Sequence, residues 1–171
     1  MPDRVLQRIA EWKRLHPLWY VVVWTNAMVI RHFPSLHEAL VSTPTSSDVL
    51  RYHIIARYGG VFLDTDLVPL RALPAAITES PFTACKRPGN GSRWSACEIA
   101  CDAVIGAPRG HGEIQRVAVS ALQRTKQRKT PEAPDDGTAT GPRVQWAAAS
   151  LPHSSIKNLR ASEVGVRLDG C

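Results

Sequence analysis

In the stretch from Ser47 to Leu70, four of the charged residues could do chemistry, two on each side of a pair of glycines. Asp64 and Asp66 follow a short apolar run after the glycines, and Asp48 and Arg51, about one helical turn apart, precede them. Two carboxylates separated by one residue repel each other, so holding them together costs free energy unless a positive group lies between them. Carboxylate ligands without imidazole suit Mg²⁺ or Mn²⁺, which also accept waters and the oxygens of a substrate phosphate. The spacing therefore indicates a metal–nucleotide site.

A purely structural interpretation of the same residues also exists. Aspartate is favoured in turns, and a bare D-x-D occurs often by chance. Asp48 and Arg51 could form an i,i+3 ion pair at a helix start, worth about a few tenths of a kcal/mol. Taken alone, the four residues favour this structural interpretation.

Local signals predict how the chain positions these residues. Ser46 and Ser47 are good N-caps, and Asp48 stands where the helix dipole favours a negative charge. Apolar residues then recur at helical intervals until Gly59, a typical residue just past a helix end. We expect a helix from about Asp48 to Tyr58, a turn at Gly59–Gly60, and a strand over 61–63. This strand would deliver Asp64 and Asp66 at its carboxyl end, where ligands bind in open α/β sheets.

The remaining elements alternate as in an α/β fold. The pattern predicts a helix over 5–15, ended by Pro17, and a buried strand over 19–24, which is a β-branched and aromatic run. Further expected elements are a short helix over 35–41, strands over 82–85 and 103–107, a helix over 111–127, a helix over 142–149 and a strand over 164–168. Segment 129–142 is the most loop-like and a candidate mobile active-site segment.

Composition restricts the class of protein. With 44% hydrophobic and 21% charged residues in 171, the chain fits a single globular domain, residues 1–171. The net charge of +6 favours anionic partners and is compatible with peripheral membrane contact. Basic residues cluster in two places, at Arg4, Arg8, Lys13 and Arg14 and at Arg124, Lys126, Arg128 and Lys129. Neither cluster is interleaved with aromatics as a nucleic-acid stacking surface would be, so we expect no nucleic-acid partner. Residues 1–17 carry charge throughout and no run is long enough for a membrane helix, which predicts a cytoplasmic location.

The four cysteines are expected to be reduced and structural, as is usual inside cells. Cys97 and Cys101 with His111 could suggest zinc. Their spacing lacks a C-x2-C pair and a clear fourth ligand, so zinc ranks below plain buried thiols.

The surroundings of the aspartates form a longer pattern, S-D-x-x-R-Y, then Y-G-G followed by three hydrophobic residues, D-x-D and a proline. This resembles the DxD-containing sugar-binding glycosyltransferases, which include the yeast mannosyltransferase that initiates outer-chain glycans, bacterial capsule transferases and, more distantly, clostridial toxin glucosyltransferase domains. The matching positions are Ser47, Asp48, Arg51, Tyr52, Tyr58, Gly59, Gly60, Asp64, Asp66 and Pro69.

Weaker similarity extends the resemblance from Trp12 to Ala148, through segments 12–25, 102–111 and 140–142. Two family segments have no counterpart here. These are an opening strand reading I-P-K-I-I-H-Q-x-W and a closing H-x-x-x-S-W-type segment. We therefore expect a domain that lacks the usual first strand and is shortened at both ends.

The resemblance implies a GT-A type α/β domain, with a mixed sheet and flanking helices, that uses Mn²⁺ or Mg²⁺. It would move a hexose from a UDP- or GDP-sugar to a glycan or other glycoconjugate acceptor with retention, as in polysaccharide biosynthesis. Asp66 would bind the metal directly, and Asp64 would contact ribose and sugar or reach the metal through water. Asp48 and Arg51 would hold sugar hydroxyls.

The resemblance adds two further residues to the substrate site. Tyr58 matches the family pattern and is expected in the core or in the pocket wall, because aromatic residues on helices usually pack. Asp102 stands where the family pattern more often has asparagine. Asp102, Asp135 and Asp136 are the remaining candidates for a nucleophile, and the sequence does not choose between them.

Two rival functions stay open. The first is a degenerate transferase domain that binds a nucleotide sugar or glycan without turnover. The second is a haloacid-dehalogenase-like phosphatase, in which the first aspartate of D-x-D is the nucleophile. That reading explains 62–66 but leaves 47–60 unexplained, so it ranks lower.

Overall fold

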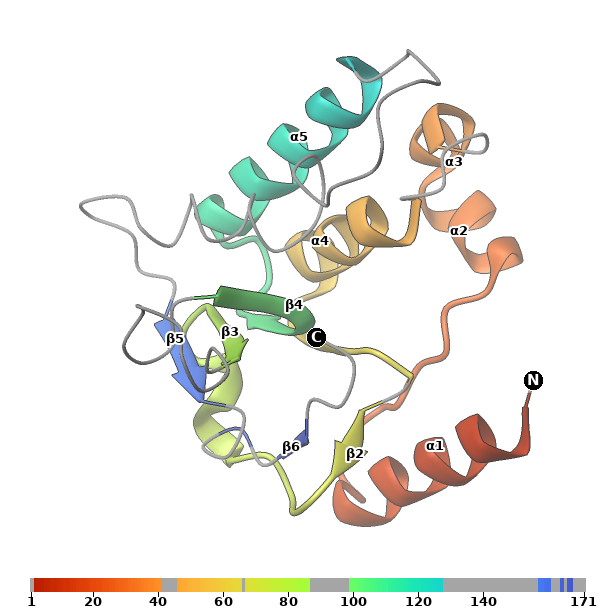
Figure 1. The fold of residues 1–171 in the computed structure, drawn as a ribbon. Helices are drawn as coiled ribbons and strands as arrows, with labels where there is room; N and C mark the ends of the chain where they lie inside the picture. The colour runs from red at the N-terminus through yellow and green to blue at the C-terminus, as the bar shows by residue number, and fades with distance from the viewer. Residues whose placement is uncertain are drawn as a thin grey trace, which may run out of the picture.

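A mixed four-stranded sheet lies at the centre of the computed structural model (Figure 1). Its order is β1–β4–β3–β5. Strand β4 pairs antiparallel with both β1 and β3, whereas β3 pairs parallel with β5. The bounds are β1 Gly60–Leu63, β3 Phe82–Lys86, β4 Ile99–Ala107 and β5 Lys157–Arg160. A two-stranded antiparallel ladder joins β2 Val68–Pro69 to β6 Val166–Arg167.

The structure describes residues 2–40, 46–65, 67–86, 99–127, 157–160, 164 and 166–167, with only the backbone at residue 46 and at most of the residues of β3, β5 and β6 and the first half of β4. Its helices are α1 Asp3–Leu15, α2 Asn26–His32, α3 Pro34–Leu40, α4 Ser46–Tyr58, the short 3₁₀ helix η1 Ala75–Thr78 and α5 Gly112–Gln127. None of these described helices is long and apolar enough to cross a membrane.

Helices cover both faces of the sheet, which gives two apolar cores. Helices α4 and α5 lie along one side, and α1 lies on the other (Figure 1). The α4–α5 core includes Tyr52, Ile55, Ile105 and Ile114. The α1 core includes Trp12, Leu73, Ile77, Phe82 and Val104.

Strand β1 contributes to the two cores in alternation. Phe62 packs against the α4–α5 core, while Val61 and Leu63 pack against the α1 core. Successive side chains of a strand point to opposite faces, so Phe62 and the residue two positions on, Asp64, share the α4 side. This alternation directs Asp64 toward α4.

Two glycines make the sharp turn from α4 into β1. Gly59 and Gly60 have φ of 70° and 90°, a region that favours glycine. A Cβ on Gly59 would lie 2.6 Å from the backbone nitrogen of Arg109, so this position also requires a close backbone approach. The predicted turn is thus confirmed, with a packing reason that the sequence did not show.

The predicted α/β class, with a mixed sheet and flanking helices, is confirmed. The helices predicted over 5–15, 35–41, 48–58 and 111–127 are present, as are the strands over 61–63, 82–85 and 103–107. The strand predicted over 164–168 is present as the two residues of β6. Helix α2 and strands β2 and β5 were not predicted. Segment 128–156, with the predicted loop and the helix over 142–149, lies outside the described residues.

The predicted buried strand over 19–24 is wrong. Residues 20–25 form no ladder, and Tyr20 and Val22 are 98% and 52% exposed. A β-branched run becomes a strand only where a partner offers backbone hydrogen bonds, and no described strand pairs with this one. The chain instead turns after α1, where the buried His16 ring contacts the rings of Trp12 and Trp19.

Helix α2 follows directly, and its start has a local cause. The hydroxyl oxygen of Thr25 accepts a hydrogen bond from the backbone N–H of Met28 at 3.4 Å, as an N-cap does. The sequence T-N-A-M contains this N-cap signal. Because a strand was predicted over the preceding residues 19–24, helix α2 was not predicted.

Candidate functional site

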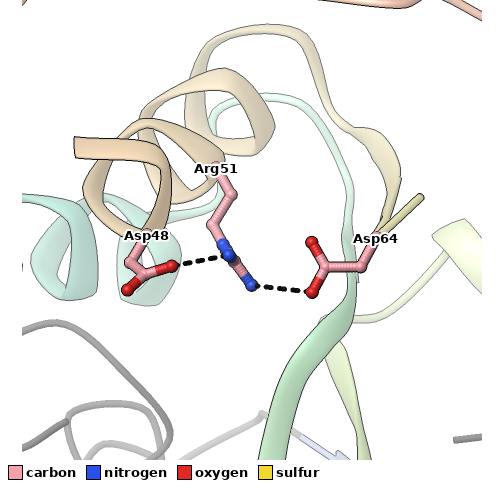
Figure 2. Close-up of polar contacts among 3 residues, drawn as sticks. All are labelled: Asp48, Arg51 and Asp64. Atoms are coloured by element: carbon pink, nitrogen blue, oxygen red, sulfur yellow. Dashed lines mark hydrogen bonds and ion pairs between the residues drawn. The ribbon is translucent and has the colours of Figure 1, made fainter. Parts of the chain in front are cut away.

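A buried guanidinium lies between two carboxylates where α4 faces the end of β1 (Figure 2). The Nη2 of Arg51 lies 2.6 Å from Oδ1 of Asp48, and its Nη1 lies 3.5 Å from Oδ2 of Asp64. Asp48 and Arg51 come from the first turns of α4, and Asp64 directly follows β1. Three residues that the sequence singled out are therefore brought together.

Burial differs between the two kinds of charge. The side chain of Arg51 is 7% exposed, whereas those of Asp48 and Asp64 are 28% and 34% exposed. A molecule that arrives from solvent would meet the carboxylate oxygens before the guanidinium. The arrangement is thus a pair of accessible hydrogen-bond acceptors backed by a covered cation.

An aromatic ring supports the guanidinium. The Cζ of Arg51 lies 4.8 Å from the centroid of the Phe62 ring. This distance is typical of a cation–π contact, in which the electron-rich face of the ring attracts the cation. Phe62 reaches this position because it points to the α4 side of β1, as does Asp64 two residues later.

Backbone contacts hold the turn that carries Asp64. Its N–H donates to the carbonyl of Ala103 in β4 at 2.9 Å, and its carbonyl accepts from the N–H of Leu67 at 3.2 Å. From the other face of the sheet, Nη1 of Arg8 in α1 donates to the carbonyl of Thr65 at 3.3 Å. Arg8 was not predicted to approach the D-x-D turn, since only the packing of α1 brings it there.

The structure changes how the cost of the clustered charges is explained. The sequence argument required a positive group between Asp64 and Asp66. Arg51 is one such group for Asp64, and at the same time it neutralises Asp48. Asp66 lies outside the described residues, so its position relative to Arg51 is not part of the described site.

The described residues hold no group of three or more His, Cys, Asp or Glu side chains that could bind a metal ion. Of the two predicted ligands, the structure places Asp64. Its carboxylate is partly exposed, and carboxylate oxygens are the ligands that Mg²⁺ and Mn²⁺ prefer. In that respect Asp64 fits the predicted hard cation.

The backbone at Asp102 lies beside the site. It belongs to β4 and precedes Ala103, whose carbonyl accepts the hydrogen bond from Asp64. Its side chain is outside the described set, as are Asp135 and Asp136. The role of Asp102 therefore stays a prediction.

Tyr58 lies at the other end of α4 from Asp48. At a rise of about 1.5 Å per residue, the ten positions between them span about 15 Å. The hydroxyl of Tyr58 lies 2.9 Å from Nδ1 of His32, and its ring packs with Trp24 and Phe33. The structure thus places Tyr58 in an aromatic cluster and does not bring it to the carboxylates.

The alternative zinc group falls largely outside the described residues. Cys97 is not described and only the backbone of Cys101 is, while His111 lies in the turn before α5. Zinc and the state of the thiols stay predictions.

Comparison with known proteins bears on this geometry. The model of a family described as "Glycosyltransferase sugar-binding region containing DXD motif" matches residues 2–83. The match covers 82 of the 171 residues, just under half, and contains Asp48, Arg51, Asp64 and Asp66. It supports the family resemblance and a glycosyltransferase-type function, and together with the mixed α/β arrangement it fits a GT-A-like domain.

A solved structure named "PaToxG Glycosyltransferase" is similar to the chain, with 12% sequence identity and a TM-score of 0.49. The similarity covers 73% of this chain and 43% of that one, so the chain spans less than half of its length. No curated protein matches the chain significantly.

Proposed function

We propose that the chain is a metal-dependent glycosyltransferase that moves a hexose from a UDP- or GDP-sugar to a glycan or glycoconjugate acceptor. The observation that carries this proposal is the convergence of Asp48, Arg51 and Asp64 inside the segment that matches a sugar-binding family model. A salt bridge at a helix start would explain Asp48 and Arg51 alone. It would not explain why the same guanidinium also reaches the residue after β1.

Each group has a chemical role in this proposal. The carboxylates of Asp48 and Asp64 accept hydrogen bonds from sugar hydroxyls, and the planar guanidinium of Arg51 fixes both carboxylates and donates where a hydroxyl oxygen approaches. Asp64 and Asp66 would hold the divalent cation. When bound, that cation offsets the negative charge that grows on the diphosphate leaving group.

The finer parts of the proposal follow from the sequence resemblance. They are transfer with retention, a role in polysaccharide biosynthesis, and Asp102 as a donor contact. A single domain over residues 1–171 is a prediction from length and composition. A cytoplasmic location and peripheral contact with a membrane stay predictions from charge and composition.

A direct assay tests the proposal. The purified chain is incubated with Mn²⁺ and a panel of UDP- and GDP-sugars, and release of free nucleoside diphosphate is followed. We expect release that requires the cation and is abolished in Asp64→Asn and Asp66→Asn. Asp3→Asn, an exposed aspartate at the start of α1, is the matched control and should retain full activity.

Other outcomes would favour the rival functions. Cation-dependent binding of a nucleotide sugar without turnover would indicate a binding domain. Hydrolysis of simple phosphomonoesters, with no response to any nucleotide sugar, would contradict the transferase and support the phosphatase. If turnover is present, the anomeric configuration of the product, read by NMR, tests retention.

A further inference from the structure

The ring of Phe62 lies against the Arg51 guanidinium, which joins the carboxylates of Asp48 and Asp64. The Arg51 guanidinium is 4.8 Å from this ring and contacts Asp48 and Asp64 on its edges. Ion pairs alone do not fix the tilt of a guanidinium, because either carboxylate can follow it by rotating its own side chain. A flat ring beneath the group restricts that tilt.

We propose that Phe62 is a positioning residue for the donor-sugar contacts, acting through Arg51. The ring holds the guanidinium plane, the guanidinium holds the carboxylates of Asp48 and Asp64, and these present their remaining oxygens to the donor. The inference rests on the proposed function, since it takes the two carboxylates as donor contacts.

Three observations support this role. Phe62 is partly buried and packs against the α4–α5 core, so apolar contacts support its ring. The side chain of Arg51 is 7% exposed, and cation–π contacts are strongest where water is excluded. Lastly, Phe62 in β1 and Asp64 directly after β1 are two residues apart and point to the same face of the sheet, so a shift of the strand would move ring and carboxylate together.

The chain offers a matched control on the same helix. The guanidinium of Arg57, six positions after Arg51, lies 5.2 Å from the ring of Phe33. This pair belongs to the aromatic cluster at the far end of α4. Phe33→Leu removes the same kind of contact without touching Asp48 or Asp64.

The test measures donor binding and turnover for the full chain, loaded with Mn²⁺, at a temperature where each variant is folded by circular dichroism. The probe is the UDP- or GDP-sugar that the wild type accepts. We expect Phe62→Leu to weaken donor affinity and raise KM about tenfold, with a smaller effect on kcat. Phe62→Tyr keeps the aromatic face and should restore affinity, whereas Phe33→Leu should leave it unchanged.

A second measurement needs no donor. In urea denaturation, Phe62→Leu and Arg51→Met should lower the midpoint by less together than the sum of their separate effects, because they remove the same contact. Additive midpoint shifts would overturn the contact. Equal loss of donor affinity in Phe62→Leu and Phe33→Leu, or unchanged affinity in Phe62→Leu, would overturn the positioning role. Failure of the wild type to bind any nucleotide sugar would instead overturn the proposed function, and with it this role, whatever the midpoints show.

Discussion

A single imidazole ties the end of α1 to a segment 57 residues away. Nε2 of His16 accepts a hydrogen bond from the backbone N–H of Leu73 at 2.7 Å, and Nδ1 lies 3.0 Å from the carbonyl of Trp12. A carbonyl only accepts, so Nδ1 donates to Trp12 while Nε2 accepts from Leu73. His16 is buried, so both contacts are shielded from water.

His16→Phe should therefore lower the free energy of unfolding by about 1–3 kcal/mol, since it leaves the buried Leu73 N–H without an acceptor. Urea denaturation measures the change. His37→Phe, at a half-buried position on α3, controls for the change of ring type and should have a much smaller effect. Equal losses in the two variants would contradict the link.

His53 on α4 gives the chain a second imidazole-dependent property. Burial lowers the pKa of His53, and a hydrogen bond with the backbone of Ala118 only partly opposes this. Its Nε2 is buried and has no hydrogen-bond partner among the described residues. Protonation in the folded state would place a charge there without compensation.

Stability should fall in mild acid for this reason. As the pH is lowered, the unfolded chain binds a proton at His53 near the usual pKa of 6.5. The folded chain binds this proton only at a lower pH. The stability that neutral His53 contributes to the folded state is fully present above pH 6.5. It is lost as the pH falls below 6.5 toward the lowered pKa of His53 in the folded state. Comparing unfolding at pH 7.5 and 5.5 should show a smaller drop for His53→Gln than for the wild type. An unchanged drop would refute this explanation.

At the scale of elements, the α4–turn–β1 unit could be predicted because its signals are local. Serine caps, helical periodicity and two glycines lie within the segment that they organise. That Asp48, Arg51 and Asp64 belong to one sugar site was implied only by the resemblance to the glycosyltransferase family. The contact of Arg51 with Phe62 depends on which face of β1 meets α4, and that is decided by packing across the sheet.

Two of the elements that were missed or wrong depend on distant partners, unlike α2, whose start has a local signal. Segment 19–24 has strand-forming residues but no described ladder partner. Strand β5 has the sequence Lys-Asn-Leu-Arg, without an apolar pattern, and is a strand because it pairs in parallel with β3. Neither the lack of a described partner for segment 19–24 nor the pairing of β5 with β3 can be deduced from the local sequence.

Gly59 in the α4–β1 turn and Gly110 in the turn between β4 and α5 offer a matched pair of substitutions. Gly59 and Gly110 have φ of 70° and 74°, but only Gly59 has backbone atoms in the path of an added Cβ. Each Gly→Ala change should cost about 1–2 kcal/mol from the left-handed backbone. Gly59→Ala should cost clearly more, and thermal unfolding can compare the two. If Gly59→Ala and Gly110→Ala lowered the Tm equally, the backbone at Arg109 would have moved to accommodate the added Cβ at little cost.

At the scale of the whole molecule, two cores share one sheet. If residues 1–171 form a single cooperative domain, damage to either core should weaken the same transition. Ile55→Ala in the α4–α5 core and Leu73→Ala in the α1 core should each lower the free energy of unfolding by about 2–5 kcal/mol. Leu6→Ala, at a half-exposed position on α1, should have little effect.

Circular dichroism and tryptophan fluorescence should give coincident transitions in both core variants. Two separated transitions, each sensitive to one variant, would show that the two faces of the sheet unfold independently. That result would also contradict the predicted single domain.

The unpaired run after α1 has a practical consequence for work with this protein. Leu18, Tyr20 and Val22 are exposed large apolar side chains on backbone without a described ladder partner. Such a segment favours self-association, because a neighbouring chain can pack against its apolar side chains and can pair with its backbone as a strand. We expect Val22→Lys to reduce concentration-dependent scattering of light without loss of helical signal. Aggregation of the purified protein through this segment would then be the first practical problem, and one added charge should reduce it.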